Sequence, residues 1–202
     1  QQRRSQHRID LLDINYLYMP SIDSLFREKY LEKDENYILK YNYEDRFIVR
    51  TGYSYIYNSA GRALMNNSGI GNSYTIRLNF ESAGNLLYAV AKLGGMKKNA
   101  SGEYTLLNIP FAQYLKGDFD FAKNLVIDNR NSLAFHFGAG IAIPYGNATM
   151  LPFEKRYFSG GANSVRGWSV RDLGPGSFPG DNNFMNQSGD IKLDASIEYR
   201  TR

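Results

Sequence analysis

Residues 132–145 read Ser-Leu-Ala-Phe-His-Phe-Gly-Ala-Gly-Ile-Ala-Ile-Pro-Tyr and alternate between two kinds of side chain. Every second residue from Leu133 to Tyr145 is apolar, and most of these side chains are large. The residues between them are small or polar. Successive side chains of a β-strand point to opposite faces, so this pattern predicts a strand with one apolar face and one small or polar face. A period of two also argues against a helix, whose faces repeat every 3.6 residues.

The same alternation recurs along most of the chain. From 191 to 200, apolar residues beginning with Ile191 alternate with mostly charged residues beginning with Lys192. The weak pattern at 86–93 could also form a short helix. The chain is therefore expected to be all-β, with about eight antiparallel strands. The remaining candidates are 37–43, 46–58, 73–81 and 109–123, with weaker patterns at 8–18 and 86–93.

Composition excludes several classes of protein. The 202 residues suffice for one domain, and the absence of cysteine excludes a disulfide scaffold, a thiolate metal site and a cysteine nucleophile. The 24 basic and 20 acidic residues are mixed along the chain without a basic block, so nucleic acid is not an expected partner. The longest apolar runs, such as 86–91, are far shorter than the roughly 18 residues of a membrane-spanning helix.

The lengths of the predicted connections favour one of two all-β architectures. A soluble antiparallel β-sandwich has half-buried strands that alternate in the same way. An outer-membrane barrel also has short turns on one side and long loops on the other, with aromatic residues at the strand ends, and Tyr53, Tyr55 and Tyr57 suit such a girdle. An antiparallel transmembrane β-barrel is therefore favoured. The predicted short links are 44–45, 82–85 and 124–130, and the long ones are 19–36, 59–72, 94–107 and 146–188.

The connection at 146–188 carries the most specific pattern in the chain. It is about three times as long as a usual loop, which indicates function or disorder. It contains Gly160-Gly161, then Ser-Val-Arg-Gly-Trp at 164–168 and Leu-Gly-Pro-Gly at 173–176. These motifs resemble the signature loop of the BamA/TamA-type outer-membrane assembly factors, the bacterial surface antigen family. The sequence of the loop is more similar to TamA-like members, especially those of Bacteroides-type bacteria, than to BamA itself.

This resemblance implies an internal fragment of a larger outer-membrane protein. Residues 1–202 would belong to one multi-pass barrel domain of about sixteen strands in a Gram-negative outer membrane, without its POTRA modules and its first and last strands. The implied function is protein insertion or translocation, with no enzymatic activity and no cofactor. The implied partners are client outer-membrane proteins, the lipid bilayer and a periplasmic or inner-membrane accessory protein.

The resemblance also implies roles for particular residues of the signature loop, Val165, Arg166, Gly167 and Trp168. In the family this loop folds back into the barrel, where its arginine contacts acidic side chains on the lumen wall. Arg166 would be that arginine, Gly167 would let the backbone turn closely beside the wall, and Trp168 would pack below. In the family the acidic partners lie mainly on strands that come after the one at 189–200, so Asp194 and Glu198 on that strand are only the fallback candidates within this chain. Loop backbone with unusual angles is expected at Gly160, Gly161, Gly174 and Gly176.

Other chemistries have little support in the sequence. His7 and His136 are the only histidines, so neither a Ser-His-Asp triad nor a histidine metal site is predicted. The pair Asp118 and Asp120 shares one strand face and is interpreted as solvated lumen wall rather than as a cation site. A passive outer-membrane channel, with the long loop as a constriction, is the alternative function, and a soluble β-sandwich binding module is a third.

Overall fold

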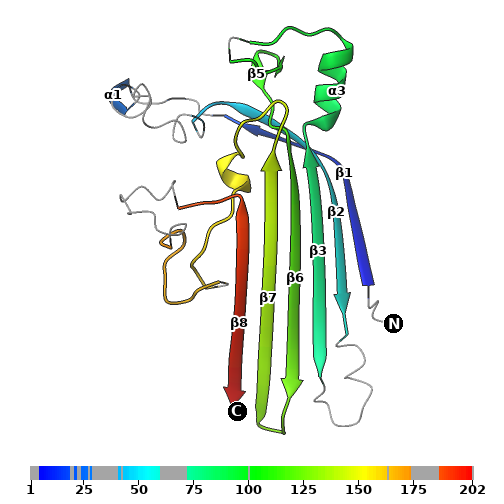
Figure 1. Cartoon of the computed structure of the whole chain (residues 1–202), viewed down its shortest axis with the longest axis vertical. Helices are drawn as coiled ribbons and strands as arrows, with labels where there is room; N and C mark the ends of the chain where they lie inside the picture. The colour runs from blue at the N-terminus through cyan, green and yellow to red at the C-terminus, as the bar shows by residue number, and fades with distance from the viewer. Residues whose placement is uncertain are drawn as a thin grey trace.

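The computed structural model describes residues 5–18, 21, 24–26, 28, 41, 43–59, 72–99, 101–162, 164–173 and 187–201. Six long strands form one antiparallel sheet in the order β1-β2-β3-β6-β7-β8, so strands that follow one another along the chain lie side by side (Figure 1). The expected all-β fold is confirmed. The strands are β1 (Ser5–Leu17), β2 (Arg46–Asn58), β3 (Ser73–Ala83), β6 (Tyr114–Val126), β7 (Asn131–Pro144) and β8 (Ile191–Thr201).

Two of the expected strands need a separate account. The segment 86–93 lies within helix α3, so the strand interpretation is wrong and the helical alternative is correct. Its exposed apolar residues Leu86, Val90 and Leu93 follow a helical spacing, and Gly84, at a φ of 74°, directs the chain out of β3. The segment 37–43 lies largely outside the described residues, and β1 pairs directly with β2. The short elements are α1 (Ser24–Phe26), α3 (Asn85–Leu93), β4 (Thr105–Leu106), β5 (Ile109–Pro110) and the 3-10 helix η4 (Phe153–Lys155).

The connections between the strands lie at partly different ends of the sheet from those that the sequence predicts. β2 ends and β3 begins at the same end of the sheet as the short β6–β7 turn at 127–130 (Figure 1). The sequence predicts that the link 59–72 lies with the long loops, and this prediction is wrong because the link lies at the end of the β6–β7 turn. With a helix at 86–93, the links 18–45, 84–113 and 145–190 share the opposite end, which is called the long-loop end below. The short-turn end therefore also carries the 59–72 link, but the three longest links share the long-loop end, which is the asymmetry seen in outer-membrane barrels.

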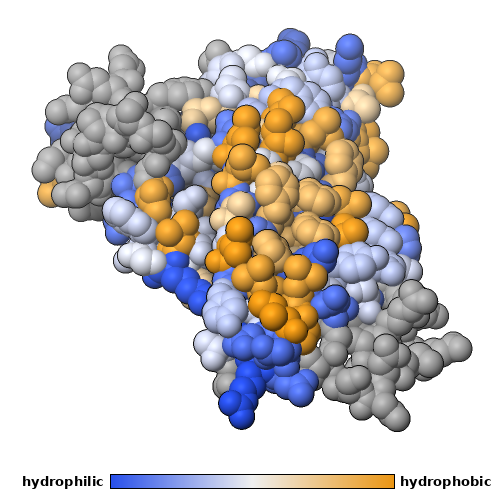
Figure 2. All heavy atoms as spheres, turned by 60° about the horizontal axis from the view of Figure 1, so that its bottom comes forward, coloured by the Kyte–Doolittle hydropathy of each residue, from blue (hydrophilic) through white to orange (hydrophobic). Residues whose placement is uncertain are grey.

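The sheet has one apolar face that is largely uncovered. Cross-strand register aligns Leu78 with Phe119, Ala139 and Leu193, and neighbouring rows are similarly apolar. Figure 2 shows apolar residues gathered in a continuous band. A β-sandwich would bury such a face under a second sheet, and among the described residues no second sheet of comparable size exists. No helix in the described ranges has the length and hydrophobicity to cross a membrane.

Aromatic side chains flank this apolar face at both ends of β2. At the long-loop end, the Phe47 ring stacks on Tyr16 with 4.8 Å between centroids. At the other end, the Tyr57 ring lies 5.5 Å from Tyr74. Ten residues separate positions 47 and 57, which is about 34 Å along a strand and roughly 25 Å across a membrane at the usual barrel tilt. This height matches the apolar band of an outer-membrane barrel.

The opposite face of the sheet is polar, and the protein's small core lies on it at the long-loop end. There, the first part of the 146–188 connection covers the strands, with Leu151 fully buried and Tyr157 packed against the core. Burial of apolar side chains therefore holds this connection on the polar face rather than away from the sheet. The core consists of Ile48, Ala83, Ala112, Tyr114, Ala142 and Leu151.

Candidate functional site

The connection between β7 and β8 has two parts that contact the polar face differently. Residues 151–160 are called the loop root, and residues 164–173 the loop arm. Tyr157 joins the root to the start of β8, because its backbone N–H and C=O both hydrogen-bond to Gly189 at 2.8 Å. Its side chain turns the other way, toward the middle of the sheet.

Tyr157 occupies a notch in the sheet. Its hydroxyl donates a hydrogen bond to Asp118 Oδ1 at 2.6 Å, and its ring lies over Gly140 so closely that a Cβ there would be 2.6 Å from Cζ. Only glycine at this position leaves room for the ring. Burial, followed by the hydrogen bond to Asp118, raises the pKa of the Tyr157 hydroxyl well above its usual range. The hydroxyl therefore remains a hydrogen-bond donor at physiological pH.

Lys155 makes the second attachment of the loop root. Its Nζ lies 2.8 Å from Glu81 Oε1, and the two side chains are only 15% and 14% exposed. Lys116 Nζ donates a hydrogen bond to the Lys155 carbonyl at 3.0 Å and lies 4.1 Å from the centre of the Tyr157 ring. A charged pair with so little solvent contact is costly to break, because the remaining charge loses its compensation.

Glu81 is the centre of a larger ionic cluster on the polar face. Arg50 Nη1 donates to Glu81 Oε2 at 2.7 Å, and the Tyr114 hydroxyl donates to Glu81 Oε1. Arg50 also pairs with Asp13 on β1. The cluster therefore joins β1, β2, β3 and β6 beneath the loop root.

The loop arm turns back on the root as a hairpin. Gly160 and Gly161 have φ of 96° and 91°, and a Cβ at Gly160 would lie 2.1 Å from the Ser169 carbonyl oxygen. Ser159 forms a β-bridge with Leu173 across the hairpin. The other two loop glycines named in the sequence analysis, Gly174 and Gly176, lie outside the described residues.

Arg171 connects the arm to the root. Its guanidinium carbon lies 4.2 Å from the centre of the Phe153 ring and 4.6 Å from that of Phe158, so it contacts both rings. Its backbone N–H donates to the Ser159 carbonyl at 3.0 Å, and its φ of 62° is unusual for a residue with a side chain. No local sequence pattern indicates this role of Arg171, because the loop must fold back on itself before the side chain can reach the two rings.

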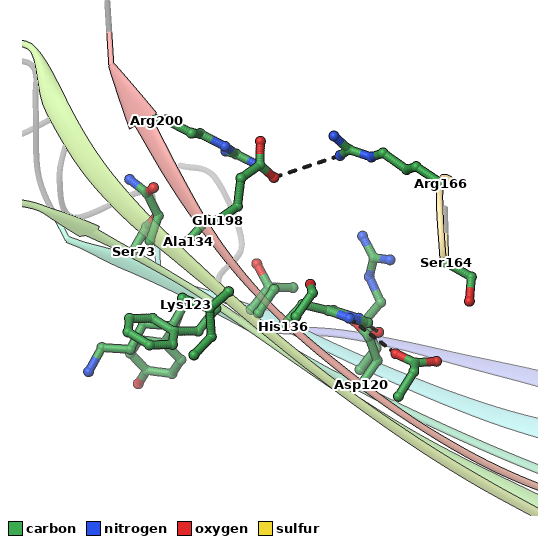
Figure 3. Close-up of a pocket in the computed structure, with 18 of the residues that line it drawn as sticks. Ser73, Asp120, Lys123, Ala134, His136, Ser164, Arg166, Glu198 and Arg200 are labelled. Atoms are coloured by element: carbon green, nitrogen blue, oxygen red, sulfur yellow. Dashed lines mark hydrogen bonds and ion pairs between the residues drawn. The ribbon is translucent and has the colours of Figure 1, made fainter. Parts of the chain in front are cut away.

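Arg166 extends from the arm toward β8. Its Nη2 lies 3.7 Å from Glu198 Oε2 (Figure 3), with 72% of the arginine side chain and 42% of the glutamate side chain exposed. Arg200 pairs with the same carboxylate at 3.2 Å. The other candidate partner, Asp194, lies 3.0 Å from Lys192 and pairs with it instead.

The remaining signature residues lie at the outside of the arm. The Trp168 N–H donates to the Val165 carbonyl at 3.2 Å, which closes a turn around Arg166 and Gly167. A Cβ at Gly167 would meet no atom within 4 Å, and Trp168 is 51% exposed. Among the described residues, the expected close approach of Gly167 to the wall and the burial of Trp168 are therefore not seen.

A polar hollow lies between the arm and the sheet. His136 Nε2 is 2.5 Å from Asp120 Oδ2, and its Nδ1 is 3.3 Å from Asp194 (Figure 3). Asp118 and Asp120 are thus engaged by Tyr157 and His136. In the part of the chain that the structure describes, no group of three or more His, Cys, Asp or Glu residues could hold a metal ion. Charged residues of both signs line the hollow, including Arg77, Arg166, Lys192, Glu198 and Arg200.

Comparison with protein families identifies the superfamily of this chain. The model of the Omp85 superfamily domain matches residues 21–202, nearly the whole chain. No curated protein matches it. The matched family comprises outer-membrane proteins that insert or transport other proteins, acting on outer-membrane clients together with accessory partners. The resemblance to BamA/TamA-type proteins is thereby confirmed at the level of the superfamily.

Proposed function

Because the chain belongs to the Omp85 superfamily, we propose that it forms the part of an outer-membrane barrel whose loop arm lies in the lumen and supports the insertion or translocation of client proteins. One observation carries the proposal: the loop crosses the polar face of the sheet and brings Arg166 within 3.7 Å of Glu198. Val165, Gly167 and Trp168 form the turn that presents this arginine. The TamA-like subfamily rests on the sequence motifs alone.

The proposed mechanism uses backbone pairing and requires no cofactor or covalent step. A client strand would add to an exposed strand edge of the barrel, since unpaired N–H and C=O groups there bind an incoming strand. The seam between the first and last strands of the barrel would provide this edge. The exposed Arg166–Glu198 pair is weak enough to break and re-form during such a rearrangement. Clients, the lipid bilayer and an accessory protein are the proposed partners.

The test uses the full-length protein that contains this chain, reconstituted in liposomes. A urea-denatured client barrel is added, and its protease resistance is followed in parallel with empty liposomes. We expect the protein to accelerate the client's acquisition of resistance and Arg166→Ala to slow it, with the variant itself still inserted in the membrane. Unchanged client assembly by an inserted Arg166→Ala variant would contradict the role of this arginine.

The charged hollow beside Arg166 favours one second candidate, a passive channel with the loop as its constriction. The same liposomes distinguish the two functions. Steady ion conductance without acceleration of the client would support the channel. Arg77→Gln, which removes one charge of the hollow, would then alter ion selectivity.

A further inference from the structure

The loop root is attached to the sheet by contacts that lie outside the signature motif. We propose that Lys155 and Tyr157 are positioning residues for Arg166: they lock the loop root onto the polar face and so fix where along β8 the arm can place the arginine. This inference rests on the proposed function and deepens it, because it names the residues that hold the loop inside the barrel. The lock comprises Lys155 on Glu81 and Tyr157 on Asp118 and Gly140.

The receptor for these two side chains is shaped for them. Gly140 supplies the space for the Tyr157 ring, and Asp118 accepts the hydrogen bond of its hydroxyl. Glu81 meets Lys155 in a setting with little solvent contact, so this ion pair is held more firmly than a surface pair. The lock therefore combines a shape match with a shielded ion pair, and each part can be tested separately.

The contact made by Arg166 cannot determine the position of the arm by itself. Its ion pair with Glu198 is long and exposed, and Arg200 competes for the same carboxylate. Tyr157 pairs with Gly189 just before β8, whereas Glu198 lies nine residues further along, about 30 Å at the rise of a strand. Arg171, held between two phenylalanines of the root, transmits the root's position to the arm.

Paired spin labels in the full-length protein in liposomes test the lock directly. This chain has no cysteine, so the exposed Ser169 on the arm and Ser196 on β8 can each be replaced by cysteine and labelled. We expect one narrow distance distribution in the parent. Lys155→Met and Tyr157→Phe should each increase the displaced fraction of arms about tenfold, the usual effect of losing a charge-assisted hydrogen bond.

Conservative and distant variants separate positioning from general damage. Lys155→Arg keeps the cation and should restore the narrow distribution, while Lys97→Met and Tyr199→Phe change exposed residues away from the root and should leave it unchanged. The urea midpoint of the barrel is measured in every variant. Distances that stay narrow in both Lys155→Met and Tyr157→Phe would overturn the inference, as would equal broadening in Lys155→Arg or in the distant variants.

The client assay separates this inference from the proposed function. If the parent accelerates client assembly, Lys155→Met should slow it and Lys155→Arg should restore it. If the parent fails to accelerate any client, the proposed function fails, and the label distances alone still decide whether Lys155 and Tyr157 position the arm.

Discussion

The loop root and the loop arm belong to one connection, yet the sheet holds them very differently. In the root, Lys155 and its partner Glu81 are both largely shielded from solvent, and Tyr157 fits a notch at Gly140. In the arm, Arg166 is mostly exposed and its ion pair spans 3.7 Å. The motif that is most recognisable in the sequence therefore lies on the less firmly held part. Different residues of the same loop therefore attach it to the sheet and form the family motif.

This difference has a physical explanation. A shielded ion pair is costly to break, whereas an exposed one exchanges readily with water and salt. A fixed root with a loosely held arm allows the arm to move without releasing the loop from the barrel. The variants below test this division, beginning with the largest expected effect.

Glu81→Gln should have the largest effect, because it removes the charge that compensates both Lys155 and Arg50. We expect the free energy of unfolding to fall by about 3 kcal/mol, the usual cost of an uncompensated buried charge. Urea unfolding of the barrel in detergent measures this loss. Glu154→Gln, at an exposed position of the same root, is the matched control and should be nearly neutral. An equal decrease in the free energy of unfolding in the two variants would contradict the proposed difference between shielded and exposed charges.

Gly140→Ala should have the next largest effect, because the new Cβ would collide with the Tyr157 ring. We expect a loss of about 1–3 kcal/mol together with displacement of the root. Gly117→Ala on β6 is the control, since a Cβ there meets no atom within 4 Å and removes the flexibility of a strand glycine. Unfolding in urea should show opposite signs for the two glycines. A neutral Gly140→Ala would show that the notch is not required.

Arg166→Ala should leave the stability of the barrel unchanged within error, in contrast to its expected effect on client assembly. Exposed ion pairs often contribute nothing measurable, and Glu198 retains Arg200 as a partner. The midpoint of urea unfolding checks this expectation, with Arg200→Ala as the comparison. A large shift of the midpoint would mean that the arm is as firmly held as the root.

The β6–β7 turn should show the smallest effect, at the end of the sheet far from the loop. Hydrogen bonds from the Asn131 side chain, then from the Arg130 backbone, lower the pKa of the exposed Asp128 carboxyl. A pKa lowered by folding stabilises the turn above the carboxyl's unfolded pKa, and this contribution is lost as the pH falls through the folded value. Amide exchange at Asn131 should therefore differ between the parent and Asp128→Ala near neutral pH and converge in acid. Identical amide exchange in the two proteins at every pH would show that the Asp128 carboxylate does not stabilise the turn.

Much of the fold could be predicted because alternation is a local property. Leu133 to Tyr145 and Ile191 to Tyr199 define strand faces without reference to any other segment, and β7 and β8 were placed nearly to the residue. The segment 86–93 was ambiguous because a short apolar run suits both helix and strand. Counting 86–93 as a strand also placed the link 59–72 at the wrong end of the sheet. Each additional strand moves the neighbouring connection to the opposite end.

The site was predicted only in part, for a related reason. The motif around Arg166 is contiguous and could be recognised, but its partner had to be chosen between Asp194 and Glu198. In the structure Asp194 is already paired with Lys192 and His136. The position of the arm then brings Arg166 close to Glu198 instead. Arg171 carried no local signal at all.

The sequence by itself determined the all-β class, the apolar and polar faces of the strands, and the superfamily to which the loop motif belongs. These properties depend on the order of neighbouring residues. Only the tertiary structure decided how the loop is held, because Tyr157 meets Asp118 across 39 positions of the chain and the fit needs Gly140 on a third segment. Such contacts depend on strand register and loop path together, and no local pattern records either.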